Sequence, residues 1–247
     1  MPSPFLLRLD ALGFLEAGDL EVLRRLIGKE EEVEAGAQVV SQGSDETRVF
    51  VVNSGWAIRY KTIRDGGRQI LNFVTPGDVS GVYSLLFSRA EHTIEALTPM
   101  RLAFFQNRAL LDAFGESPRL AVVLTWFAGQ DARLLAEQIV RVGRRPGAER
   151  MAHLLVELHL RRRRAGAGDT ESRRFPVTQV LLADALGMSH VHTHRIFRGL
   201  ARDGFVTRKQ SDVWLEDVNG LARLAGFDAG YLEQPAIPAA TRTKLVD

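Results

Sequence analysis

The chain has 247 residues, of which 45% are hydrophobic and 25% are charged, and its formal net charge is +2. These values are typical of a soluble globular protein with one or two domains. The chain contains no cysteine, which excludes disulfides, thiolate zinc sites and cysteine-ligated iron–sulfur clusters. Since the N-terminus carries no basic segment with a long apolar run, and no segment is apolar enough to span a bilayer, we expect a cytoplasmic protein with no membrane contact.

The charge is unevenly distributed along the chain. From Arg144 to the C-terminus there are 17 Lys and Arg residues against 12 Asp and Glu residues, whereas the preceding part holds 15 against 18. A basic C-terminal part is typical of a DNA-binding module joined to a part that does not contact DNA.

The N-terminal half changes its periodicity once. Residues 1–30 have apolar side chains at helical spacing and predict short helices. Between Val33 and Asn107, short β-rich runs alternate with glycine-containing turns, which predicts a compact antiparallel β-barrel or sandwich. The expected strands and turns are residues 49–55, 56–63 and 68–74 as strands, Asp65, Gly66 and Gly67 as a hairpin turn, 81–88 as a short helix, and 92–105 as two more strands.

A long helix is predicted next, from Arg119 to Val142, after a short helix at residues 109–117 and a proline at its first turn. Its apolar stripe is wide enough for two partners, and a small β-barrel covers one side of such a helix. We therefore predict that the other side packs against a second copy of the chain. The predicted dimer contacts are Leu120, Leu124, Phe127, Leu134, Leu135, Ile139 and Val142. The alternative is a helix that lies wholly on its own barrel.

Residues 143–147 read as a hinge, because glycine and proline interrupt the helical pattern there. A further helix is predicted from Ala148 to about Arg163. Its last turn carries the run Arg161–Arg164, which we interpret as a solvated helix end that suits the helix dipole rather than as a phosphate contact. Residues 165–174 are expected to form a polar loop.

Residues 177–206 predict two helices joined by a tight turn. Thr178 caps the first helix, Gly187 ends it in the left-handed conformation, and Ser189 caps a second helix from His190 to about Arg202. The apolar positions of the second helix are Val191, Ile196, Phe197 and Leu200. Two helices joined this tightly form the motif whose second helix enters the major groove of DNA. A two-stranded wing with residues 209–212 at its tip and a short helix at 218–225 are predicted to follow.

The polar side of the second helix suits DNA. Arg195 can donate two hydrogen bonds to guanine, a histidine can contact a base edge, and Ser189 can hold a phosphate at the helix N-terminus. A plain helical hairpin with a solvated basic face is the alternative. His190 and His194 share a helix face and could bind a metal, but His192 points away and no carboxylate has a matching spacing, so we predict no metal site.

This order of elements resembles the Crp/Fnr family of bacterial transcription regulators, over about Leu9 to Tyr231, and residues 181–206 and 213–228 are the most specific match. The resemblance implies an α+β fold: a β-roll of the cyclic nucleotide-binding type at 1–118, a dimerisation helix at 119–143 and a winged helix-turn-helix at 144–232. The residues at 233–247 lie beyond the match, and their composition predicts a flexible, disordered tail. The resemblance also implies a homodimer on a near-palindromic operator. Base contacts fall on His190, Val191, His194 and Arg195, and phosphate contacts on Thr178, Gln179, Ser189 and His192. The basic helix and the wing add Arg198 and Lys209 as phosphate contacts.

The effector end departs from the family pattern. Members that bind cyclic AMP carry a glycine–glutamate pair, and later an arginine followed by serine or threonine. The corresponding residues here, which we predict to line the effector pocket, are Gly81, Val82, Tyr83, His92 and Thr93. A buried phosphate without a guanidinium is poorly compensated, so we expect no usual cyclic AMP response and no bound cofactor. Haem held by a histidine stays open, although no pattern positions one.

The sequence thus predicts a dimeric transcription regulator whose partners are double-stranded DNA, a second copy of the chain and RNA polymerase. The competing hypothesis is a small-molecule sensor that acts through protein contacts. We expect no enzyme, because the chain shows no acid/base pair, nucleophile motif, phosphate loop or metal cluster.

Overall fold

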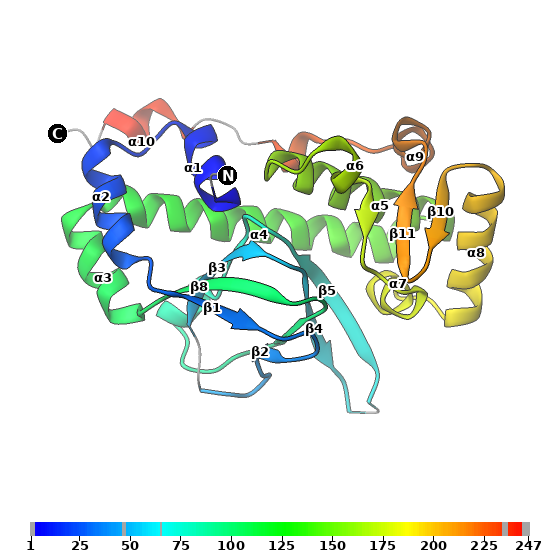
Figure 1. Ribbon diagram of the computed structural model, residues 1–247, viewed down its shortest axis with the longest axis horizontal. Helices are drawn as coiled ribbons and strands as arrows, with labels where there is room; N and C mark the ends of the chain where they lie inside the picture. Colours follow the sequence, from blue (N-terminus) through cyan, green and yellow to red (C-terminus); the bar gives the residue numbers. More distant parts are fainter. Residues whose placement is uncertain (1–2, 46–47, 65, 234–236, 244–247) are drawn as a thin grey trace.

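The computed structural model of the protein describes residues 3–45, 48–64, 66–233 and 237–243. A β-roll, one long helix and a winged helix-turn-helix follow each other along the chain, in the predicted α+β class (Figure 1). No helix in these ranges combines the length and the apolar character that crossing a membrane requires.

Short helices cover one face of the β-roll. They are α1 (Pro4–Leu12), α2 (Ala17–Leu26) and α3 (Asn107–Glu116). The pattern of apolar residues on these helices buries Phe5, Leu9 and Leu23 against strand residues such as Val49 and Phe105. The sequence correctly predicted helices in both regions.

The β-roll consists of two four-stranded antiparallel sheets. One sheet has the order β1 (Glu30–Val33), β8 (Met100–Phe105), β3 (Val49–Ser54), β6 (Val79–Ser80); the other has the order β2 (Gln38–Val40), β7 (Thr93–Ala96), β4 (Ala57–Thr62), β5 (Arg68–Val74). Alternation decides which side chains lie between them: Phe50 and Val52 of β3 face the interior, whereas Val49 and Val51 face the helices.

The predicted connections of the β-roll are confirmed with small differences. The hairpin between β4 and β5 closes with Ile63 N–H donating to Gly67 O at 2.9 Å, and Gly66 has a φ of 83°. The predicted turn residue Asp65 lies outside the described residues. The expected helix at 81–88 is a single 3₁₀ turn, η1 (Val82–Leu85).

The long helix α4 (Pro118–Arg144) runs from the N-terminal helices to the winged domain (Figure 1). Helix α5 (Gly147–Arg164) starts after a break of two residues, Arg145 and Pro146. The predicted hinge is therefore shorter than five residues, because Gly143 and Arg144 continue the helix and the proline occupies the N-cap of the next one.

The C-terminal domain is a winged helix-turn-helix. Its elements are α6 (Asp169–Ser172), β9 (Arg174–Phe175), α7 (Gln179–Leu186), α8 (His190–Arg202), β10 (Val206–Lys209), β11 (Asp212–Leu215) and α9 (Val218–Ala225), with η2 (Gly230–Leu232) after it. Helix α6 and Arg174, the first residue of β9, lie within residues 165–174, where a polar loop was predicted. The loop prediction is wrong there because Phe175, which is fully buried, pairs with Val213 and adds a third strand to the wing.

The winged domain and the β-roll share one hydrophobic core. Outward-facing residues of β4 and β5, including Ile58, Tyr60 and Ile70, pack with Leu155 of α5 and Leu182 of α7. The winged domain therefore packs against the β4–β5 hairpin.

The arginine run at the end of α5 is not a solvated helix end. Arg161 and Arg162 are 8% and 7% exposed. Arg161 donates to Asp78 at 2.6 Å, and Arg162 donates to Glu171 at 2.5 Å. The prediction of a solvated helix end is wrong for these two residues, because Asp78 of the β-roll neutralises Arg161 and Glu171 of α6 neutralises Arg162.

The prediction of a disordered tail is wrong for residues 237–243. Ile237 is 5% exposed in the core beneath the N-terminal helices, and α10 (Ala239–Thr243) follows it. Arg242 donates to Leu12 O at 3.2 Å, so the end of the chain returns to α1 (Figure 1). Residues 234–236 and 244–247 lie outside the described ranges.

Candidate nucleic-acid interface and effector cavity

Local capping fixes the two helices of the turn where the sequence predicted them. Thr178 Oγ1 accepts from Leu181 N–H at 3.3 Å at the start of α7, and Gly187 ends that helix with a φ of 60°. Ser189 Oγ accepts from His192 N–H at 3.3 Å and opens α8. Each cap satisfies a backbone donor that the helix itself leaves unpaired.

One side of α8 is exposed to solvent. The four residues predicted to contact bases are all exposed, namely His190, Val191, His194 and Arg195. Val191 is 82% exposed, whereas Phe197 and Leu200, two other apolar positions of this helix, are buried. Arg198, a predicted phosphate contact, lies one turn further on the same exposed face.

Side-chain contacts orient this face. His194 Nδ1 donates to Gln179 Oε1 of α7 at 2.8 Å. Arg195 Nη2 donates to His192 Nδ1 at 2.7 Å. Since a guanidinium has five N–H donors, Arg195 keeps several for a base edge while this contact limits its rotation.

The two main strands of the wing, β10 and β11, follow α8 in the same domain. Lys209 ends β10, with its Nζ 3.8 Å from Glu216 Oε1 and 4.8 Å from the centroid of the Trp214 ring. Gln210 next to it adopts a φ of 58°, which makes the tight turn at the tip. At the two helix N-termini, the cap hydroxyls of Thr178 and Ser189 accept hydrogen bonds from the backbone, so each can still donate its proton to an anion.

A close contact below α8 escaped the sequence reasoning. A Cβ atom at Gly147 would lie 2.4 Å from Ile196 Cδ1 and 2.9 Å from His192 Nε2. The start of α5 therefore packs directly under the exposed helix. The hinge pattern of residues 143–147 concealed this steric role.

Polar contacts join α7 to the β-roll and to α4. Arg68 of β5 donates to Asp184 at 2.9 Å and 2.7 Å through two nitrogens. Gln138 Nε2 of α4 donates to Ala185 O at 2.6 Å and also contacts Ile70 O at 3.3 Å. These contacts set the orientation of the helix-turn-helix relative to the β-roll, and no local motif could have predicted them.

A buried polar cluster lies where α4 and α5 meet. Arg141 forms an ion pair with Glu157, which also accepts from Tyr231 Oη at 2.8 Å. Arg141 Nε donates to His153 Nδ1 at 3.2 Å. Burial, and then the nearby Arg141, lower the pKa of His153 to about 3, so this imidazole is neutral at pH 7.

The predicted dimer contacts separate into covered and exposed residues. Leu120, Leu124 and Phe127 are 3%, 7% and 4% exposed, because they pack against this chain's own helices and strands. The prediction that these three contact a partner is wrong for that reason. Leu134, Leu135 and Val142 are half-buried, and Ile139 is 69% exposed.

A stripe of α4 that shares only Ile139 with the predicted contacts is open. It consists of exposed residues at alternating spacings of four and three, namely Thr125, Gly129, Ala132, Ala136, Ile139 and Gly143. This is the heptad spacing of a helix–helix seam, and small residues allow close approach of two helices. The bulky apolar residues of α4 were predicted to contact a partner, but several of them pack against the β-roll and the N-terminal helices of the same chain.

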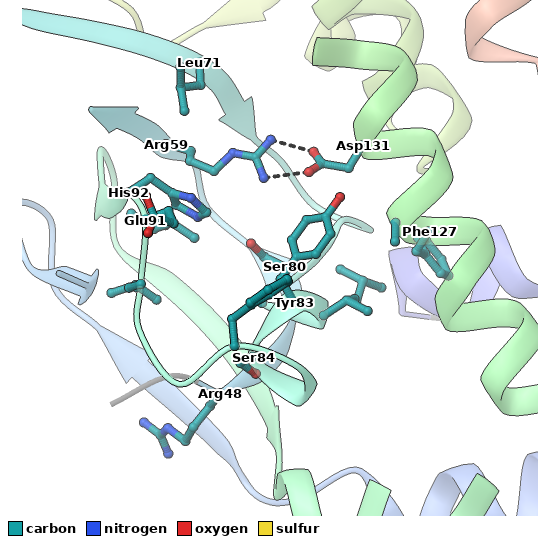
Figure 2. A pocket seen from close by; sticks show the side chains of 18 of the residues that line it. Arg48, Arg59, Leu71, Ser80, Tyr83, Ser84, Glu91, His92, Phe127 and Asp131 are labelled. Atoms are coloured by element: carbon teal, nitrogen blue, oxygen red, sulfur yellow. Dashed lines mark hydrogen bonds and ion pairs between the residues drawn. The ribbon is translucent and has the colours of Figure 1, made fainter. Parts of the chain in front are cut away.

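A cavity of about 330 Å³ lies between the β-roll and α4 (Figure 2). The predicted pocket residues that line it are Gly81, Val82, Tyr83 and His92. Thr93 is not among the lining residues, since its Oγ1 accepts from Gln42 N–H at 3.0 Å within the strand region. Gly81 has a φ of 79°, and a Cβ there would lie 2.1 Å from Arg48 O, so this turn requires glycine.

The cavity contains a guanidinium that the sequence reasoning missed. Arg59 of β4 enters it and donates to both carboxylate oxygens of Asp131 of α4, at 2.7 Å and 2.6 Å (Figure 2). The expectation of a pocket without a guanidinium is therefore wrong; the arginine comes from a strand, not from the segment that carries it in the family pattern. Burial, followed by Arg59, lowers the pKa of His92 to about 4.

No group of three or more His, Cys, Asp or Glu side chains is arranged to hold a metal within the described residues. His190 and His194 are exposed on α8, as expected for residues on one helix face.

Comparison with known proteins gives two family matches. Residues 30–117 match the cyclic nucleotide-binding domain, and residues 149–224 match the Crp-like helix-turn-helix domain. The nitrogen fixation regulation protein FixK of Rhizobium meliloti is 27% identical over 176 residues, which cover 71% of this chain and 77% of FixK. The transcriptional activatory protein AadR of Rhodopseudomonas palustris is 28% identical over 185 residues, covering 71% of this chain and 76% of AadR. The structure of FixK2 from Bradyrhizobium japonicum superposes with a TM-score of 0.72 at 22% identity, covering 83% of this chain and 100% of FixK2.

Proposed function

We propose that this chain, which belongs to the Crp/Fnr family of transcription regulators, binds DNA as a homodimer and places α8 of each subunit in the major groove. The observation that carries the proposal is the solvent-exposed face of α8, which carries His190, Val191, His194 and Arg195. An α-helix with donors and an apolar contact on one face matches the width and chemistry of the major groove.

Each residue of that face has a role in reading DNA. Arg195 donates two hydrogen bonds to guanine O6 and N7, the histidines contact base edges, and Val191 packs on a thymine methyl group. The phosphate contacts fall around this face, on Thr178, Gln179, Ser189, His192, Arg198 and Lys209. Such contacts fix the register of the protein on the duplex without reading its sequence.

The dimer forms along the exposed stripe of α4 defined above, from Thr125 to Gly143. Two copies related by a two-fold axis bury these small residues against each other. The two α8 helices then reach half-sites about one helical turn apart, which suits a near-palindromic operator.

The cavity between the β-roll and α4 is the effector site of this regulator, with Gly81, Val82, Tyr83 and His92 in its wall. A ligand there contacts the helix on which the dimer is built. The chain does not respond to cyclic AMP in the usual way, carries no resident cofactor, and is a regulator rather than an enzyme. It acts in the cytoplasm, and RNA polymerase is its further partner.

Selection of bound sequences from random duplex DNA, with purified protein and no added ligand, tests this function. We expect enrichment of a two-fold symmetric site with half-sites about one turn apart. The Arg195→Ala variant removes the guanine contact and should lose the enrichment, while Arg24→Ala, at an exposed site on α2, should keep it. Enrichment of an asymmetric site, or equal enrichment by the Arg195→Ala variant, would contradict the proposal. No enrichment of any site would favour a sensor that acts through protein contacts.

A further inference from the structure

The C-terminal segment at residues 237–243 is bound to the N-terminal helices. Ile237 is 5% exposed and belongs to the hydrophobic core that contains Phe5, Leu9 and Phe14. Helix α10 follows it and lies beside α1 and α2, at the end of the molecule opposite to α8 (Figure 1). Burial of an isoleucine side chain removes apolar surface from water, so Ile237 is an apolar anchor for this segment.

A charged contact adds to the apolar anchor. The last turn of α1 carries no basic residue, and Gly13 ends this helix in the left-handed conformation. Arg242 donates to the carbonyl oxygens of Leu12 and Gly13, both at 3.2 Å, and its guanidinium lies 5.8 Å from the centroid of the Phe14 ring. Carbonyl groups at the end of a helix have no partner within the helix, and a cation is favourable there. The C-terminal segment therefore completes α1.

The chain between the winged domain and this anchor is bound to α4 and α5. Tyr231 Oη of η2 donates to Glu157 of α5 at 2.8 Å, and Arg133 Nη2 of α4 donates to Gly230 O at 2.8 Å. Leu232 is 7% exposed. These residues lie beyond 149–224, the part that matches the helix-turn-helix domain. The path back to α1 is therefore an addition to the matched domain.

The winged domain is thus attached to the rest of the chain at two distant places. The first attachment is the break at Arg145 and Pro146, where α4 ends and α5 begins. The second is the segment at 237–243, which packs near the start of α4 (Figure 1). A domain held only by a two-residue break can turn about it. The second attachment opposes such a rotation for as long as Ile237 stays in its site.

We propose that residues 237–243 form a clamp that keeps the winged domain docked on the β-roll and limits the orientations of α8. Docking itself uses the shared core around Ile70 of β5 and Leu182 of α7. Because the seated segment is covalently joined to the winged domain, it raises the effective concentration of that domain at its docking surface. Any process that lifts Ile237 out of its site frees the winged domain to separate from the β-roll.

Thiol labelling of the full-length protein without DNA tests the clamp. Since the chain contains no cysteine, one introduced cysteine reports on one place. Ile70→Cys lies on the side of β5 that the winged domain covers, whereas Val52→Cys lies between the two sheets of the β-roll; both positions are 0% exposed. When reclosing is faster than reaction with dithionitrobenzoate, the labelling rate is proportional to the population of the open form.

Two changes release the clamp in different ways. Ile237→Asp removes the apolar anchor. Insertion of about ten glycine and serine residues directly after Glu233 keeps Ile237 and Arg242 but slackens the connection to the winged domain. We expect both changes to speed labelling at Ile70→Cys about tenfold or more and to leave labelling at Val52→Cys unchanged. Ala240→Asp, at an exposed position of α10, is the matched control and should leave both rates unchanged.

Three results would overturn the proposal. Unchanged labelling at Ile70→Cys after Ile237→Asp would show that the segment does not restrain the winged domain. Unchanged labelling after the insertion would show that packing of the segment matters but its connection does not. Equal acceleration at Ile70→Cys and Val52→Cys would show that the segment stabilises the whole fold and is no clamp. Because DNA is absent, none of these results affects the DNA selection experiment.

Discussion

The reading head, formed by α7, α8 and the wing, and the effector cavity differ in how their residues are brought together. In the reading head, Thr178, Gly187 and Ser189 determine the local backbone within a dozen residues of one another, and the exposed face follows from helical spacing. In the cavity, Arg59 and Asp131 lie on separate elements and are 72 residues apart in the chain. Local capping signals therefore predict the two helices of a helix-turn-helix well, whereas a pocket between a sheet and a helix depends on tertiary packing.

The first prediction concerns the exposed stripe of α4 and carries the largest expected effect. Ala136→Arg places a charged side chain in the middle of the stripe and should dissociate the dimer. Loss of the second reading head should then weaken operator binding by about 10²- to 10⁴-fold. Sedimentation equilibrium and operator titration measure both. Gly115→Arg is the control, since a Cβ at this exposed site on α3 meets nothing within 4 Å. A dimeric Ala136→Arg protein would show that the interface lies elsewhere.

The second prediction separates the covered side of the same helix from its open side. Leu124 is 7% exposed in the core under the N-terminal helices, so Leu124→Ala should lower the free energy of unfolding by about 2–5 kcal/mol. The monomer–dimer equilibrium, measured well below the melting temperature, should stay the same. A variant of normal stability that dissociates into monomers would instead restore the original prediction of Leu124 as a dimer contact.

The third prediction concerns the stability of the protein at acid pH, which depends on His92 in the β-roll and on His153 where α4 and α5 meet. Burial lowers the pKa of His153 to about 3 and that of His92 to about 4, from an ordinary value of 6.5. Between these values the unfolded chain binds protons that the folded chain does not, so stability must fall as pH decreases. We expect a loss approaching about 1.4 kcal/mol per pH unit for each histidine, starting below about pH 6.5.

Denaturant unfolding at pH 7.5, 6 and 5 measures this slope. In the His153→Asn variant, the slope of the unfolding free energy against pH should be smaller by the contribution of one histidine. A stability that does not change between pH 7.5 and 5 would contradict the burial of these imidazoles.

The fourth prediction is the smallest and concerns the reading head. Ser189→Ala removes the cap that accepts from His192 N–H, and should cost about 1 kcal/mol of stability. The unfolding free energy of this variant, compared with that of Ser211→Ala at the exposed wing tip, measures the cap. Equal values for the two variants would show that the capping bond contributes nothing.

Physical reasons explain what the sequence could predict. Periodicity and turn residues were sufficient for five strands of the β-roll, for α4 and for the helix boundaries in the reading head, but not for the short strands β1, β2 and β6. Periodicity alone could not tell which apolar side of α4 faces its own β-roll, so Leu120 and Phe127 were assigned to a partner. A charged residue gives no local sign of its partner either, which is why the burial of Arg161 against Asp78 and of Arg59 against Asp131 was missed.

The most direct test of the central claim is the affinity of the Arg195→Ala protein for the selected operator and for a shuffled duplex at the same salt concentration. One guanine contact per half-site is worth about 1–3 kcal/mol, so two contacts predict an operator affinity lower by roughly 30-fold to 10⁴-fold. Affinity for the shuffled duplex should change only a few-fold, because phosphate contacts remain. An equal loss on both duplexes, or no loss on either, would contradict the claim that α8 reads the sequence of DNA.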